Sequence, residues 1–365
     1  MKKEGVLQAG PARRESSLEL YRIILMFLIV AHHYVVNSSA WNVLNLDPLA
    51  PKSLFLLEFA AWGKTGINCF MMITGYFMCK SNITVRKFAK LLFIYWFYSI
   101  TIYFIFVLTG YRPFLLKDLL KAVWPIQEIA SNFYGTYIVF FLLIPFINIL
   151  IRNINEKQHI MLTGIALFMY TFLGTIPGIY VAMNYVSWYI VLYLVASYIR
   201  LYPKKLFDNR KLWGWLALGS VAASILSVLV GAWVGVKLNR IMFDYFLSDC
   251  NKILAVTNAV TSFLFFKNLR IPYSPFINSY AACTLGVLQI HANSDAMRSW
   301  LWGDVVRAGE MYESDWMIPY AILAVAVIHI VCTAIEYLRL RFVEKPVLDL
   351  LERKLEVWRN KEVQL

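Results

Sequence analysis

Windows of predominantly apolar residues recur along the whole chain at the length, about 20 residues, that an α-helix needs to cross a bilayer. Two windows, the second near 65–79 and the ninth near 276–291, are short and polar for spans, so we expect other helices to shield them. An alternative second span begins near Leu54 and includes Glu58 and Lys64. The ten windows fall near residues 18–36, 65–79, 91–109, 133–151, 160–176, 179–199, 212–236, 249–266, 276–291 and 318–338. They predict an all-α, polytopic integral membrane bundle of about ten transmembrane helices.

The composition excludes a soluble globular domain. Of the 365 residues, 60% are hydrophobic and 16% are charged, against about 45–50% and about 25% in ordinary soluble domains. The formal net charge of +13 would suggest nucleic-acid binding in a soluble protein. In a membrane protein, the same excess is typical of cytoplasmic loops. We therefore expect the lipid bilayer as a partner and no nucleic acid, while the sequence leaves the oligomeric state open.

Lysine and arginine are unevenly divided between the two sides of the predicted bundle. One set of loops, together with both chain ends, carries 24 of them, and the opposite loops carry 9. This asymmetry predicts cytoplasmic termini and a multi-pass protein of the plasma or inner membrane. The predicted organisation is a cytoplasmic tail over 1–17, a transmembrane domain over 18–338 and a basic tail over 339–365. Helical spacing in this last segment predicts an amphipathic helix on the cytoplasmic membrane surface.

The first window allows a second interpretation, a cleaved signal peptide. Arg13 and Arg14 precede an apolar stretch that ends at the small residues Ser38, Ser39 and Ala40, as in a secretory signal. The stretch is longer than a usual signal core, and it contains ionisable residues. We therefore expect it to be retained as the first span.

The sequence predicts neither a metal site nor a bound cofactor. Its five cysteines lie in or beside apolar windows and form no C-x-x-C pair, so disulfides and a zinc site are not expected. The chain contains no H-E-x-x-H, no G-x-S-x-G and no Walker-type loop. These absences exclude an ATP-driven pump and a lipase-type serine elbow.

Ionisable residues within the first window are the main candidates for chemistry, because charge inside a bilayer is costly and tends to mark function. Arg22 and His33 are eleven residues apart, which places them on one helix face about 16 Å apart along the axis. Glu19 is positioned to pair with Arg22, whereas His32 points about 80–100° away from His33. The alternatives are an interfacial anchor for Arg22 and an internally hydrogen-bonded packing histidine for His33.

Other ionisable residues carry weaker signals. His291 ends the ninth window, and Asp295 and Arg298 follow it at helical spacing. The alternative for His291 is an interfacial histidine. His329 and Glu336 share a face of the last window, where a structural polar contact is expected. His159 falls in a predicted cytoplasmic loop, so we expect it to be solvated.

Several blocks resemble the acyltransferase 3 family of membrane acyltransferases. The family's pattern of Arg or Lys, ten residues and then His falls on Arg22 and His33 within the first block. A second block is similar to the glycine-rich block of the family. The matching blocks occur in order over nearly the whole chain, at residues 14–34, 62–77, 144–148, 193–201 and 285–291.

This resemblance implies ten helices and transfer of an acyl group, usually acetyl, from a cytoplasmic coenzyme A thioester. The implied acceptor is a hydroxyl of a cell-envelope carbohydrate or lipid-linked glycan. Many family members carry an Arg-x-x-Arg pair at the third helix, where this chain has Lys87 and Lys90 preceded by Arg86. Charge is kept, but the bidentate phosphate grip of arginine is lost. We predict acyl-coenzyme A binding at these three residues.

The predicted mechanism places His33 as general base, or as the group that accepts the acyl chain itself. Arg22 orients the donor, with Glu19 and His291 in supporting roles. The cluster of Arg200, Lys204 and Lys205 either adds to a basic cytoplasmic entrance for the acyl-coenzyme A donor or only sets the topology of the chain. Tryptophans on the outer side either stack on sugar rings or form the ordinary aromatic belt, and they are Trp41, Trp300, Trp302 and Trp316.

Two rival classes fit parts of the pattern. A transporter or flippase for a polar solute or lipid-linked sugar would also have many spans and buried charges. The lack of an obvious inverted repeat in the hydropathy disfavours it. A ligand-sensing membrane domain is disfavoured because no output domain is evident.

Overall fold

The computed structural model describes residues 15–44, 46–125, 133–240 and 242–362, and every element in these ranges is a helix. Within these ranges, five helices are long and apolar enough to cross a membrane. They are α1 (Ser16–Val36), α5 (Val85–Leu108), α7 (Phe133–Asn153), α10 (Arg210–Leu238) and α15 (Met317–Arg339), which continues as the π-helix η5 (Leu340–Glu344) into α16 (Lys345–Glu362). The all-α membrane bundle is confirmed, and the count of ten spans and the cytoplasmic termini stay predictions.

The other predicted windows form shorter or broken helices. The second is α4 (Gly63–Met78), separated by a turn from α3 (Pro51–Ala60), so the longer alternative span is not formed. The ninth is split into α12 (Pro275–Ala281) and α13 (Thr284–His291). The remaining elements are α2 (Ala40–Leu44), α6 (Leu116–Val123), α8 (Glu156–Leu167), η1 (Phe168–Leu173), α9 (Tyr185–Leu201), η2 (Lys205–Asp208), α11 (Ile253–Lys267), α14 (Asp295–Arg298), η3 (Ser299–Val305) and η4 (Glu310–Glu313).

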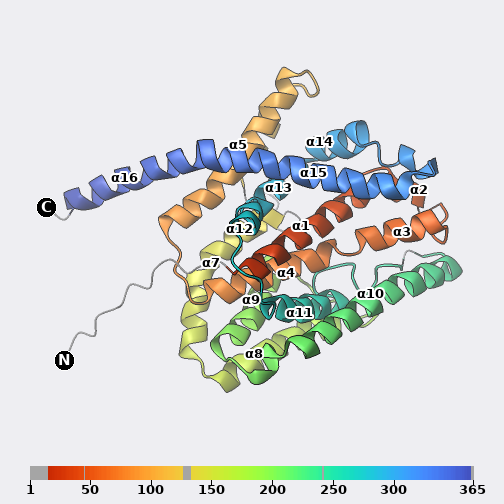
Figure 1. Ribbon diagram of the computed structural model, residues 1–365, viewed down its shortest axis with the longest axis horizontal. Coiled ribbons are helices and arrows are strands. Elements are labelled where there is room, and N and C mark those ends of the chain that lie inside the picture. Colours follow the sequence, from red (N-terminus) through yellow and green to blue (C-terminus); the bar gives the residue numbers. More distant parts are fainter. Residues whose placement is uncertain (1–14, 45, 126–132, 241, 363–365) are drawn as a thin grey trace.

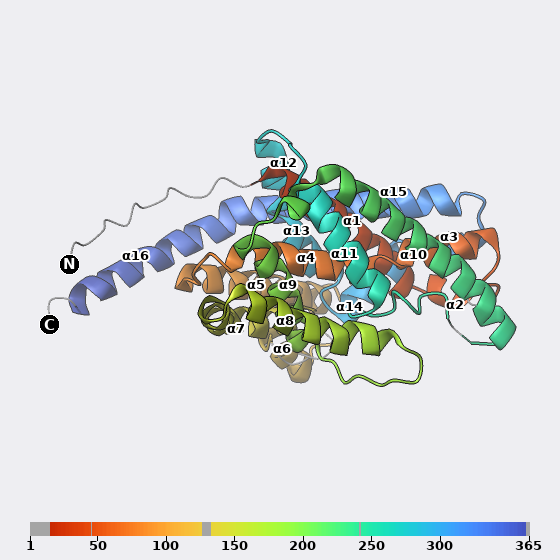
Figure 2. The same ribbon diagram turned by 90° about the horizontal axis from the view of Figure 1, so that it is seen from below.

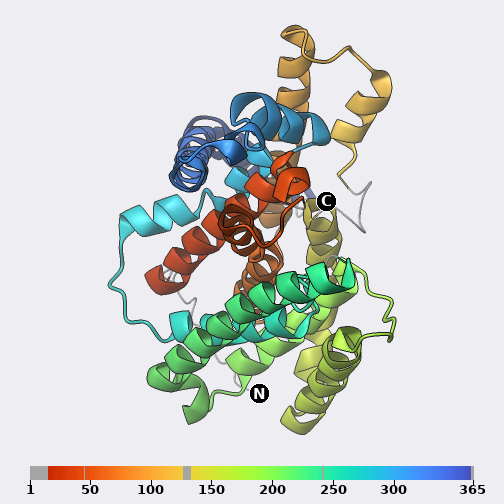
Figure 3. The same ribbon diagram turned by 90° about the vertical axis from the view of Figure 1, so that its right-hand side faces the viewer.

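Helices α1 and α4 form the middle of the bundle (Figures 1 and 2). Viewed along the long axis, α15 lies on one side of α1 and the green α10 on the other (Figure 3). Small residues allow the close packing at α4. A Cβ added at Gly75 would lie 2.9 Å from the Cβ of Ala196 and 3.1 Å from the Cα of Tyr193. This glycine therefore lets the backbones of α4 and α9 approach each other.

The segment that contains α12 and α13 packs along α1 although it lies far away in the sequence. The Oγ of Ser16 donates to Asn278 Oδ1 at 3.2 Å and accepts from the Ser274 backbone N–H at 2.9 Å. These contacts join the start of α1 to the start of α12. Because α13 then runs along α1, its last residue, His291, is carried to the level of His33.

A buried ionic cluster joins the end of α15 to its continuation. The Arg339 guanidinium donates to Glu336 Oε2 at 2.7 Å and to Glu344, and Tyr98 of α5 donates to Glu336 at 2.7 Å. His329 does not reach Glu336; its Nδ1 lies 2.8 Å from the Tyr280 hydroxyl. The polar contacts expected of this face are present, with other partners. Beyond the cluster, α16 extends past the bundle (Figure 1).

His159 is buried, so the prediction of a solvated loop histidine is wrong. It lies in the first turns of α8, and its Nε2 is 3.1 Å from the backbone oxygen of Leu194. Since α8 packs against α9, the ring is enclosed between Tyr198 and Tyr202. The apolar pattern predicts a window that begins near residue 160, whereas α8 begins at Glu156 and so includes His159.

Candidate active site

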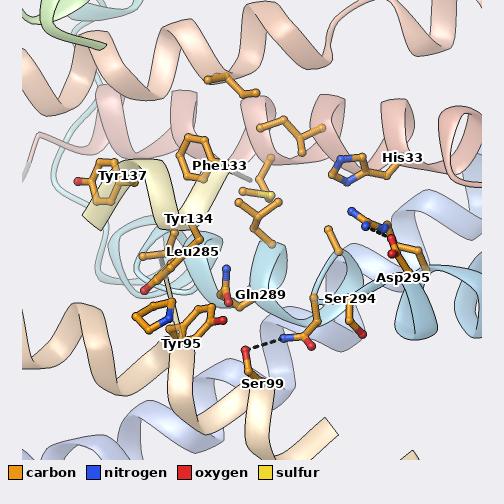
Figure 4. Close-up of a pocket in the computed structure, with 18 of the residues that line it drawn as sticks. His33, Tyr95, Ser99, Phe133, Tyr134, Tyr137, Leu285, Gln289, Ser294 and Asp295 are labelled. Carbon is orange, nitrogen blue, oxygen red and sulfur yellow. Dashed lines mark hydrogen bonds and ion pairs between the residues drawn. The ribbon is translucent and has the colours of Figure 1, made fainter. Parts of the chain in front are cut away.

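A cavity of about 680 Å³ lies between α1, α4, α5 and α13, and segments after α5 close part of its wall. From α1 its lining takes Arg22, Met26, Ile29 and His33, which follow one another at helical spacing on a single face. The prediction that Arg22 and His33 share a face is therefore confirmed. Figure 4 shows His33 and Asp295 at one end of the cavity and Tyr137 toward the other.

Arg22 is held by the acidic residue predicted to pair with it. Its Nη1 lies 3.6 Å from Glu19 Oε2 one turn earlier on α1. The Arg22 side chain is 26% exposed and lines the cavity. A guanidinium that keeps one carboxylate neighbour and still faces open space is suited to an anionic ligand.

Two hydrogen bonds fix the orientation of His33. Its Nδ1 lies 2.8 Å from Nε2 of His291, and Nδ1 of His291 lies 2.6 Å from the backbone oxygen of Val287. A carbonyl oxygen only accepts, so neutral His291 carries its proton on Nδ1 and accepts at Nε2. His33 must then donate through Nδ1. Its Nε2 is left with a free lone pair, which is the atom that a general base uses.

His32 also lines the cavity, although helix geometry points it away from His33. Its Nδ1 lies 2.5 Å from the backbone oxygen of Ala60. A Cβ added at Gly63 would lie 2.4 Å from its ring, so the imidazole occupies space that the glycine provides. The cavity extends around α1 far enough to include both histidines.

Lys64 is a site residue that sequence reasoning did not assign. Its Nζ donates to the Tyr185 hydroxyl at 2.5 Å and lies 3.8 Å from Asp249 Oδ1. The signal available in the sequence was a lysine at the edge of an apolar window. Within the described lining, basic side chains outnumber acidic ones, with Arg22, Lys64, Arg112, Lys121 and Arg298 against Asp118 and Asp295. The cavity therefore favours anions.

The three residues predicted to bind the donor do not line the cavity. Arg86 forms ion pairs with Asp349, at 3.2 Å, and with Glu352. Lys90 pairs with Glu344 at 2.8 Å. Lys87 donates to Ser81 Oγ at 2.6 Å and to the backbone oxygen of Asn82 at 2.8 Å. These side chains hold the start of α5 against α16 and the preceding loop, and their contact with a donor stays a prediction.

The second basic cluster is also engaged in contacts. Arg200 donates to the Tyr76 hydroxyl at 2.7 Å, and Lys204 pairs with Glu156 at 2.7 Å. The Glu156 carboxylate raises the pKa of Lys204, and Lys204 in turn lowers the pKa of Glu156. None of Arg200, Lys204 and Lys205 lines the cavity. A part in donor entry and a part in setting topology both stay predictions for this cluster.

For one of the four tryptophans, Trp302, both predicted roles are wrong, because it neither stacks on a sugar nor lies in an interfacial belt. Trp302 is fully buried, edge-on to Tyr34 and to His291, because η3 folds back onto the end of α1. Trp41 packs against Phe243 and Trp300 against Phe106. Trp316 is exposed. Trp302 instead supports the ring of His291.

The comparisons with known proteins give the family of the chain. The family model described as an acyltransferase domain matches residues 15–337, a range that contains every residue named above as lining the cavity. No curated protein and no solved structure matches the chain. The match covers most of the sequence, and the chain belongs to the acyltransferase 3 family of membrane acyltransferases.

Proposed function

We propose that this protein is a membrane O-acyltransferase that moves an acyl group, in the first place acetyl, from cytoplasmic acyl-coenzyme A to a hydroxyl of a cell-envelope carbohydrate. The observation that carries the proposal is the hydrogen-bonded line from Val287 through His291 to His33. It leaves a basic nitrogen at the wall of a cavity that Arg22 also lines. Family membership supplies the reaction class.

The proposed reaction uses one nitrogen atom twice. His33 Nε2 removes the proton of the acceptor hydroxyl while its oxygen attacks the thioester carbonyl carbon. The C–O bond forms, the C–S bond breaks, and the proton passes from His33 to the departing thiolate, which leaves as coenzyme A. In the covalent alternative, Nε2 attacks the carbonyl carbon first, and the C–S bond breaks to release the thiolate of coenzyme A. The hydroxyl oxygen then attacks the same carbon, the bond to Nε2 breaks, and the proton of the hydroxyl passes to the thiolate. Both routes need the same free lone pair.

Charge supports an anionic donor. Coenzyme A carries several phosphate charges, and basic side chains outnumber acidic ones in the cavity lining. In the proposed orientation, with both termini cytoplasmic in the plasma or inner membrane, Arg22 lies about 16 Å nearer the cytoplasm than His33. The thioester arm would then enter past Arg22 and end at His33. The glycan or lipid-linked glycan would reach His33 from the outer side.

Label transfer tests this proposal directly. Membranes that contain the wild-type protein are supplied with acetyl-coenzyme A radiolabelled in the acetyl group, and endogenous envelope glycans serve as acceptors. We expect label in a glycan fraction that mild alkali releases, as an O-ester requires. Absence of labelled glycan in membranes shown to contain folded protein, together with transport of a glycan or solute by the same membranes, would contradict the proposal. This result would favour a transporter or flippase.

A further inference from the structure

Gln289 is buried, faces the cavity and has no hydrogen-bonding partner among the residues that the structure describes. It is 6% exposed and belongs to the cavity lining. Figure 4 shows its carboxamide on the cavity side of α13, between Leu285 and Ser294. An amide offers both N–H donors and a carbonyl acceptor. Because the Gln289 amide faces the cavity without a partner from the described residues, a ligand in the cavity can supply its hydrogen bonds.

The position of Gln289 indicates which substrate supplies its hydrogen-bonding partner. It precedes His291 by two residues, or about 3 Å along the helix axis. The preceding helix, α12, begins beside Ser16 at the start of α1, so Gln289 lies on the Arg22 side of the histidine pair. In the proposed function, this is the part of the cavity that the donor crosses before its thioester meets His33.

The walls around this position suit a chain with isolated polar groups. Met26, Ile29, Leu285 and Leu288 line the same part of the cavity and are apolar. A sugar carries hydroxyls on nearly every carbon and would leave most of them without partners here. The pantetheine arm of coenzyme A is an aliphatic chain with two secondary amides. Each amide offers one N–H donor and one carbonyl acceptor, and the Gln289 carboxamide supplies the complement of either.

We infer that Gln289 is the binding residue for a pantetheine amide of the acyl-coenzyme A donor, an inference that rests on the proposed function. It is a specificity residue for the arm, and it takes no part in proton transfer. Its hydrogen bond would set how far the thioester extends toward His33. Acyl donors without an amide at this distance from the thioester would lose the contact.

The test compares the wild-type protein with Gln289→Leu and Gln289→Met, two changes that keep the volume and remove the amide. We expect KM for acetyl-coenzyme A to rise about tenfold in both variants, the size of one hydrogen bond to a neutral partner. With a simple acetyl thioester that lacks amides, wild type and variants should have the same KM. The kcat values should stay within about threefold of wild type, because the base is untouched.

A matched control and a binding measurement separate this inference from the proposed function. Ser227 on α10 also carries a buried hydroxyl without a partner but does not line the cavity, so Ser227→Ala should leave KM unchanged. Coenzyme A itself should stabilise the wild-type protein against heat more than Gln289→Leu. Wild type that neither binds coenzyme A nor transfers acetyl would overturn the proposed function. Wild type that does both, with variants whose KM for acetyl-coenzyme A is unchanged or whose KM for the acceptor rises instead, would overturn the inference alone.

Discussion

His33 is oriented by a residue that lies far away in the sequence. The partner, His291, is separated from it by 258 residues, and the two rings meet only because α13 packs along α1. The spacing of Arg22 and His33 was visible in the sequence, since one helix carries both. The contact between the two histidines was not, because helix packing decides it. Gln289 was missed for a similar reason, since its burial and lack of partners are tertiary properties.

Replacing His291 should slow the reaction without weakening substrate binding. In His291→Leu, His33 loses the acceptor that fixes its tautomer, so we expect kcat to fall roughly tenfold to hundredfold. His291→Gln places an amide oxygen where Nε2 accepts, and it should restore part of the rate. Steady-state kinetics with acetyl-coenzyme A measures both. A rise in KM or a fall in protein yield, with kcat unchanged, would contradict a positioning role.

At the scale of elements, hydropathy predicted where helices occur but not where they break. The chain turns at 61–62, between α3 and α4, and at 282–283, between α12 and α13. Neither break contains proline, and the apolar pattern runs through both. Tertiary contacts lie near both breaks. His32 Nδ1 is 2.5 Å from the Ala60 backbone oxygen just before the first, and Ser16 holds the start of α12 ahead of the second. Both breaks lie next to residues of the cavity, and continuous helices would point those side chains elsewhere.

Gly63 at the start of α4 provides the space that His32 occupies. In Gly63→Ala the new methyl would meet the His32 ring at 2.4 Å, so α4 or the ring must move. We expect a loss of about 1–3 kcal/mol in stability and reduced transfer, measured by thermal unfolding and label transfer. Gly219→Ala is the matched control, because a Cβ there has no neighbour within 4 Å. It should be neutral or stabilising by up to about 1 kcal/mol. Equal behaviour of the two variants would contradict this packing account.

At the scale of the whole molecule, one buried cluster joins three helical segments. Arg339 and Glu336 are each 1% exposed, and Glu344 is 5% exposed. Tyr98 and Lys90 of α5 contact the same carboxylates. The sequence showed these residues as charges near the end of the last span. It did not show that they close on one another, because that depends on the continuation of α15 through η5.

Removing the arginine from this cluster should destabilise the entire bundle. Arg339→Leu leaves two buried carboxylates without their cation, and we expect a loss of about 3–5 kcal/mol. The thermal midpoint of the purified protein in lipid nanodiscs measures it. Arg341→Leu is the matched control, since Arg341 is exposed beside Phe342, and it should change stability by less than about 0.5 kcal/mol. A midpoint for Arg339→Leu that equals that of the control would contradict the role of the cluster.

The charge asymmetry makes a definite prediction of orientation. Asp315 and Lys205 are both exposed and lie in loops that should face opposite sides of the membrane. We expect Asp315→Cys to react with a membrane-impermeant maleimide in intact cells. Lys205→Cys should react only after permeabilisation. All five native cysteines are buried, so the background should be low. The reverse pattern would place the termini outside.

The most direct test of the account is the rate of acetyl transfer in His33→Ala. His33 lies on the cavity wall with its free nitrogen available, so its removal should lower kcat by about 10²–10⁴-fold, as expected for loss of a general base. The thermal midpoint and the affinity for coenzyme A should stay near the wild-type values. A folded variant that binds coenzyme A and transfers acetyl at the wild-type rate would remove His33 from the mechanism and contradict the account.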